Sequence, residues 1–252
     1  MNEKILKTKS NGFAALFFIV LMIIVAIASF ISSIAFLKNE ALTVVGVLLS
    51  IFLFIGSVIS FGGLKVVKPQ EAIVLTLFGD YTGTIKEPGF YFVNPFSVAV
   101  NPASKTKLGQ SGDVDRQNTP IAVGNAGIEA NLDAFKKHIS LKIMTLNNSR
   151  QKINDCLGNP VEIGIAVTWK VVDTAKAVFN VDNYKEYLSL QCDSALRNIV
   201  RIYPYDVAPN VDTTGDGIAD EGSLRGSSEV VAKRIRDEIQ ARVENAGLEI
   251  IE

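Results

Sequence analysis

Few residues in this 252-residue chain have types and spacings suited to chemistry. Ser149 and Lys152 match the S-x-x-K spacing with which some Ser/Lys acylases place a lysine beside a nucleophilic serine on one helix. Here the pair follows a predicted strand and lies in a polar stretch, so a chance match is the better interpretation. A membrane-bound serine protease using Ser149 and Lys152 remains an alternative.

Metal-binding patterns are also weak. Asp212 and Asp216 match the first and fifth positions of a calcium loop, but the twelfth position is Ser223 where a bidentate glutamate belongs. We therefore expect residues 212–220 to form a solvated loop. The one histidine, His138, cannot make a histidine-rich site, and the two cysteines form no C-x-x-C pair. No catalytic residue, metal or cofactor is expected.

Composition narrows the class of protein. With 25 basic and 26 acidic residues the net charge is -1, which excludes a strongly basic nucleic-acid binder. A mean hydropathy of +0.27 is high for a soluble protein of this size.

The apolar excess lies near the N-terminus. Residues 13–37 and 41–64 hold no charged side chain, and only three residues separate the two runs. Each run is long enough to span a bilayer as a helix, because about 20 residues suffice. The runs therefore predict a transmembrane helical hairpin over residues 13–64. A cleaved signal peptide is disfavoured because its apolar region would be shorter. A channel or transporter subunit is disfavoured because the runs lack ionisable residues.

Basic residues flank the hairpin on both sides. Lys4, Lys7 and Lys9 precede it, and Lys65 and Lys68 follow it. The positive-inside rule then predicts a two-span protein of the cell membrane, with residues 1–12 and the domain after the hairpin in the cytoplasm.

Residues 66–252 alternate as strands and then as helices, which predicts a mixed α/β domain. Residues 71–78, 90–93, 139–145 and 161–171 read as strands, with a turn at 157–160 joining the last two. Residues 172–179, 183–202 and 228–246 read as helices, the last capped by Ser228 and closed by Gly247.

The strand beginning at residue 90 is aromatic and starts about 25 residues after the hairpin. We expect its side chains to face the bilayer surface, where aromatic rings are favoured. The alternative is that Phe90 and Phe92 belong to the core, since alternate strand residues share a face. The membrane-interface candidates are Phe90, Tyr91, Phe92 and Phe96.

The last helix has a narrow apolar stripe at helical spacing, formed by Val231, Ile235, Ile239 and Val243. Such a stripe suits a helix packed between its own domain and a neighbouring copy. The alternative is an ordinary amphipathic surface helix. The candidates for lateral ion pairs between copies are Arg234, Arg236, Glu238 and Arg242.

Two blocks resemble the band-7, or SPFH, domain of stomatins, prohibitins and flotillins. The first, residues 66–96, contains Phe78-Gly79, Pro88-Gly89, an aromatic strand and Asn94-Pro95. The second, residues 155–206, contains a Gly-Asn-Pro turn, a strand and a helix ending in Tyr-Pro. The chain looks nearest to bacterial flotillin- or stomatin-like members.

The resemblance implies a two-lobed α/β domain, with lobes of about 66–135 and 136–252. It also implies a non-enzymatic scaffold whose copies self-associate into rings or cages. Such proteins organise membrane patches and regulate membrane proteases or other small membrane partner proteins.

Overall fold

The computed structural model describes residues 2–6, 10–36, 40–106, 137–206, 223–225 and 227–252. The chain divides into two compact units, one of Lys4–Val100 and the other of Asn101–Glu252 with the first three residues. The lobe boundary expected near residue 135, and the loop 212–220, lie outside the described residues.

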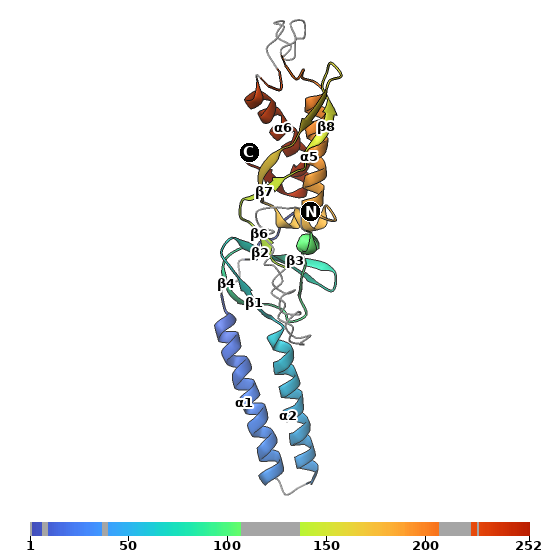
Figure 1. The fold of residues 1–252 in the computed structure, drawn as a ribbon. Helices are drawn as coiled ribbons and strands as arrows, with labels where there is room; N and C mark the ends of the chain where they lie inside the picture. Colours follow the sequence, from blue (N-terminus) through green and yellow to red (C-terminus); the bar gives the residue numbers. More distant parts are fainter. Residues whose placement is uncertain (1, 7–9, 37–39, 107–136, 207–222, 226) are drawn as a thin grey trace, which may run out of the picture. The chain divides into compact units, whose positions relative to one another are not determined.

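Two long helices dominate the first unit. The helix α1 (Gly12–Phe36) and the helix α2 (Glu40–Phe61) pack side by side, as Figure 1 shows in blue and cyan. The second apolar run stays helical only to Phe61, because Leu64 already belongs to a strand. The expected helical hairpin is present, and its last residues turn into the domain.

Short strands follow the helices in the same unit. The strand β1 (Leu64–Val67) pairs antiparallel with β4 (Gly89–Phe92). A second sheet has the order β3-β2-β5, formed by β2 (Glu71–Leu77), β3 (Asp80–Ile85) and β5 (Val98–Ala99). The middle of β2 is buried on both faces, as its continuous apolar sequence predicts. The core of this unit comprises Val67, Ile73, Leu75, Ile85 and Tyr91.

The N-terminal segment adds a piece of strand that the sequence did not reveal. Ile5 pairs in parallel with Thr84 of β3. The Leu6 N–H donates to the Thr84 carbonyl at 2.8 Å, and the Thr84 N–H donates to the Lys4 carbonyl at 2.9 Å. The N-terminal segment is therefore held on the edge of the sheet that contains β3.

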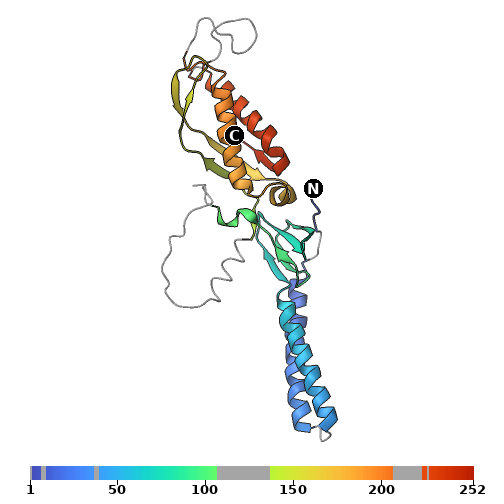
Figure 2. The ribbon, with the colours of Figure 1, turned by 90° about the vertical axis from the view of Figure 1, so that its right-hand side faces the viewer.

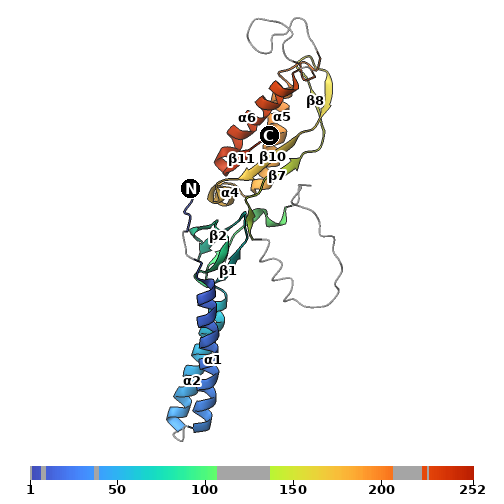
Figure 3. The same cartoon turned by 90° about the vertical axis from the view of Figure 1, so that its left-hand side faces the viewer.

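The second unit packs two helices on a small sheet. The strands run in the order β11-β10-β7, and β8 pairs with β9. Figures 2 and 3 show α5 and α6 side by side against these strands. The largest fully buried side chains of this unit include Trp169, Tyr203, Leu188, Leu196 and Ile239. Its elements are η1 (Pro102–Lys105), β6 (Ile139–Ser140), β7 (Met144–Asn147), β8 (Gln151–Asn154), β9 (Pro160–Ile163), β10 (Ala166–Val171), α4 (Thr174–Phe179), α5 (Tyr184–Val200), α6 (Ser228–Val243), η2 (Glu244–Ala246) and β11 (Leu248–Ile250).

Two strand predictions need correction. Residues 139–145 do not form one strand with Ile143 inward: β7 begins at Met144, whose side chain is buried, and Ile143 is exposed. A shift of one residue reverses the faces of a strand. The strand predicted over 161–171 is divided into β9 and β10. β10 pairs antiparallel with β7, as expected for these two strands, whereas β9 pairs across the turn at 155–159 with β8, a strand that the sequence did not reveal.

Polar side chains cap the starts of α4 and α5 close to the expected positions. The Asp173 carboxylate accepts the Lys176 N–H and caps α4, and the Asn183 side chain caps α5. The residue at the N-cap position of α6 is Ser227, one before the Ser228 expected, and its side chain makes no capping hydrogen bond. Gly247 follows η2 with φ +68°, in the left-handed region that favours glycine after a helix.

Candidate functional site

The paired helices α1 and α2 are long and apolar enough to cross a membrane. Spans of 24 and 21 residues contain 18-residue stretches with mean hydropathies of 3.1 and 2.7, and only 11% of each stretch is buried within the protein. Apolar side chains that are exposed to this extent require an apolar surrounding, so the two helices indicate association with a membrane.

Small polar residues mediate the contact between the two helices. The Ser50 hydroxyl lies 3.0 Å from the Ser29 hydroxyl and 2.8 Å from the Gly46 carbonyl oxygen. Ser33 and Ser57 are also buried. Small side chains let helix backbones approach closely in an apolar medium, and each hydroxyl needs a partner there. The Ser29–Ser50 bond therefore joins the two helices, while the Ser50–Gly46 bond lies within α2.

The aromatic strand β4 packs across the domain-side ends of both helices. The Phe90 ring fills the space beside Gly12, where an added Cβ would lie 2.6 Å from it, and stacks edge-on with Phe13 at 5.2 Å. At the end of α2, an added Cβ on Gly63 would lie 2.8 Å from the Phe92 ring. The two glycines therefore allow the ring-bearing strand to lie close to the helix ends.

Hydrogen bonds hold this junction in place. The Phe92 N–H donates to the Asn11 side-chain oxygen at 3.1 Å, just before α1. The Val93 N–H donates to the Gly63 carbonyl at 2.9 Å, just after α2. We call Asn11, Gly63, Phe90 and Phe92 the juxtamembrane junction.

The four membrane-interface candidates fall into different environments. The expectation that Tyr91 faces the bilayer surface is wrong, because its side chain is 2% exposed and belongs to the core. Its hydroxyl donates to the Glu87 carbonyl at 3.1 Å. Burial, followed by the charge of Glu87, raises the pKa of Tyr91. Phe90 and Phe92, on the opposite face of the strand, are half-buried at the helix ends. Phe96 is 57% exposed.

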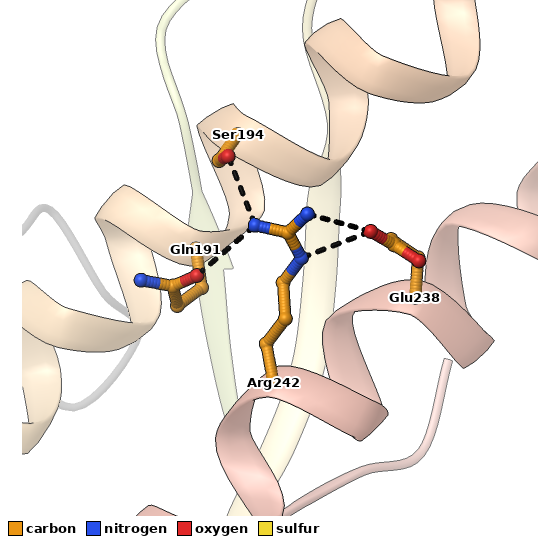
Figure 4. A network of polar contacts seen from close by, with 4 residues as sticks. All are labelled: Gln191, Ser194, Glu238 and Arg242. Atoms are coloured by element: carbon orange, nitrogen blue, oxygen red, sulfur yellow. Dashed lines mark hydrogen bonds and ion pairs between the residues drawn. The ribbon is translucent and has the colours of Figure 1, made fainter.

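The charged residues of α6 mostly serve their own domain. Figure 4 shows the Arg242 guanidinium between α6 and α5, bound to the Glu238 carboxylate at 2.6 Å and 3.0 Å and to the Ser194 hydroxyl at 3.0 Å. The Gln191 side-chain oxygen lies 3.4 Å away. Arg242 and Glu238 therefore tie two helices of one chain together, and their use in a contact with a neighbouring copy stays a prediction.

The other two α6 candidates differ from each other. The Arg234 guanidinium lies over the Tyr203 ring, 5.4 Å from its centroid, in a cation–π contact. Arg236 pairs with its exposed neighbour Asp237 at 2.9 Å, and the structure shows no other ion pair for it within the described residues. The apolar stripe of α6 is buried as expected, at Val231, Ile235, Ile239 and Val243.

Comparison with protein families matches residues 65–252 to the SPFH domain / Band 7 family model. The chain belongs to this family. A search of curated proteins gave no match. The match begins at β1, so the band-7 domain starts directly where the hairpin ends, at the juxtamembrane junction.

Within the described part of the band-7 domain, the residues suspected of chemistry do not form a reactive group. Ser149 precedes β8 and Lys152 lies in that strand, so the helix that an S-x-x-K acylase needs is not there. Burial, then the nearby Asp193, raises the pKa of the Cys192 thiol to about 12, which keeps it protonated and unreactive. No cluster of three His, Cys, Asp or Glu side chains occurs among the described residues.

Sequence reasoning missed Asp155, a buried carboxylate at the β8–β9 turn. One of its oxygens accepts the N–H groups of Leu157 and Asn159, at 2.9 and 2.7 Å. The other accepts the Asn159 amide and the Tyr205 N–H, both at 3.0 Å. Burial would raise its pKa, but these hydrogen bonds outweigh that effect and the pKa of Asp155 is lowered. The run Asp-x-x-Gly-Asn was the available signal for this turn.

Proposed function

We propose that the protein is a non-enzymatic membrane scaffold. Its hairpin anchors a cytoplasmic band-7 domain, and copies assemble into rings or cages that organise a membrane patch. The assembly regulates a membrane protease or another small membrane partner protein. The observation that carries this proposal is the direct joining of two apolar spans to a family domain through the juxtamembrane junction.

The pairing of the N-terminal segment supports the topology. Residues 4–6 hydrogen-bond to β3, which supports placing this segment on the same side of the membrane as the domain. Two spans between these points satisfy that requirement. Lys4 on one flank and Lys65 and Lys68 on the other favour the cytoplasm for this side.

The family and the α6 face support assembly. Band-7 proteins are generally membrane scaffolds, and repeated heterologous contacts around a ring allow each contact to be weak. Arg236 is the α6 candidate best placed to meet a neighbouring copy, because its partner Asp237 is the adjacent exposed residue.

The anchoring is tested by cysteine accessibility in intact cells. With Cys156 and Cys192 replaced by alanine, a cysteine is placed at Asn39, between the spans, or at Asn2. An impermeant thiol reagent should label position 39 and not position 2. Labelling of position 2 alone would contradict the topology.

The protease alternative is tested with a fluorophosphonate probe, which should not modify Ser149.

A further inference from the structure

Phe78 has an unusual conformation and environment. It lies in the turn between β2 and β3 with φ +52°, in the left-handed region that bulky side chains rarely adopt. Its side chain is 87% exposed. A strained backbone that presents a large apolar ring to the outside is a reason to look for a functional contact.

A second exposed ring accompanies it. Phe96 stacks on Phe78 with centroids 6.3 Å apart and planes at 25°, and Phe96 is 57% exposed. Val98, two residues on, is 52% exposed. Together they form an exposed apolar patch, the feature that marks protein or membrane contacts on a folded domain. We call Phe78 and Phe96 the exposed aromatic pair.

The chain places this pair beside the end of a membrane span. The second span ends at Phe61, and Pro95 packs on the next residue: an added Cβ on Gly62 would lie 3.3 Å from the Pro95 carbonyl oxygen. Phe96 directly follows Pro95, and its N–H donates to the Asn94 side chain at 3.0 Å. The pair is thus continuous with the surface at which the hairpin enters the bilayer.

We propose that the exposed aromatic pair inserts into the headgroup region of the leaflet on the domain side of the hairpin. This inference rests on the proposed membrane anchoring and adds a second membrane contact to it. Aromatic rings are favoured at this depth. Insertion on one side of the hairpin would fix the tilt of the sheet against the membrane.

The experiment uses the full chain with Cys156 and Cys192 replaced by alanine, reconstituted in phosphatidylcholine vesicles. A single cysteine at Phe78→Cys or Phe96→Cys carries an environment-sensitive NBD label. The matched control is Leu190→Cys on α5, which replaces another exposed apolar residue, at 64% exposure. Lipids brominated near the headgroup serve as quenchers.

We expect a blue-shifted emission at Phe78 and Phe96, with quenching at least threefold greater than at Leu190. Equal quenching at the three sites would overturn the inference. So would a blue shift without lipid quenching, because a neighbouring protein copy would then cover the pair. If the label is unquenched while the protein stays in the vesicles, only this inference fails and the anchoring by the hairpin stands.

Discussion

Arg242 is the residue whose role differs most from its sequence-based interpretation. Its charge pattern suggested a contact with another copy, yet its partners Gln191 and Ser194 come from α5 of the same chain. About 50 residues separate these groups in sequence, and only local spacing can be read from a single chain. The apolar stripe of α6 was predictable because it depends on such spacing alone.

Replacing Arg242 should weaken the fold. Arg242→Ala removes the bonds to Glu238 and Ser194 and leaves a half-buried carboxylate without this partner, a loss of about 1.5–3 kcal/mol in unfolding free energy. Urea unfolding of the detergent-solubilised protein measures it. Arg236→Ala is the matched control, since its exposed pair with Asp237 should contribute less than about 1 kcal/mol. Equal losses in the two variants would contradict this role of Arg242.

Asp155 should make stability depend on acid pH. Its pKa is lower in the folded chain than its ordinary value of 3.8, so its ionised form stabilises the fold above that value. The contribution is lost as the pH falls through the folded pKa. Asp155→Ala should therefore cost about 1–3 kcal/mol at pH 7, and the gap to the unmodified chain should narrow below pH 4. Chemical unfolding across pH 2–7 checks this; a gap independent of pH would exclude the carboxylate as its cause.

Among the elements, local signals placed the helices well and left the strands uncertain. Asp173, Asn183 and Gly247 mark helix ends by their own chemistry, so the limits of α4, α5 and η2 were close to those expected. Ile143 and Met144 are both apolar, so either could face inward and the alternation alone could not choose. Residues 4–6 are too few to show a strand pattern, and their partner Thr84 is far along the chain.

The junction between η2 and β11 depends on Gly247. Gly247→Ala would place a Cβ against the Asp173 carbonyl oxygen at φ +68°, combining a backbone clash with conformational strain. We expect a loss of more than about 2 kcal/mol in unfolding free energy. Gly158→Ala is the control, because its φ of +88° is also positive but no atom lies within 4 Å of the added Cβ. It should cost only about 1–2 kcal/mol. If the two variants lower the melting temperature by the same amount, the backbone clash at Gly247 is relieved and this prediction is wrong.

At the scale of the whole molecule, the hairpin and the domain class were predictable because they depend on run length and alternation. The assembly contact was not, because a single chain carries no information about which exposed charge meets a neighbour. After Arg242 and Glu238 are assigned to the domain itself, Arg236 is the candidate that can be tested without breaking the fold.

Arg236→Glu should lower the mass of the solubilised oligomer while circular dichroism stays unchanged. In the proposed ring, the reversed charge would face the group that pairs with Arg236 on the neighbouring copy. A small loss of contact energy would then recur at every interface of the ring. Sedimentation measures the mass, and Lys233→Glu, an exposed charge reversal on the same helix, is the control. If Arg236→Glu still sediments as the full assembly, this face of α6 is not the lateral contact.

Electron microscopy of particles extracted with their surrounding lipid tests the central claim most directly. The account predicts closed rings or cages of many copies, each with its hairpin in the lipid and its band-7 domain outside it. Particles that contain a single 27.3 kDa chain at the same protein density would contradict assembly into a scaffold.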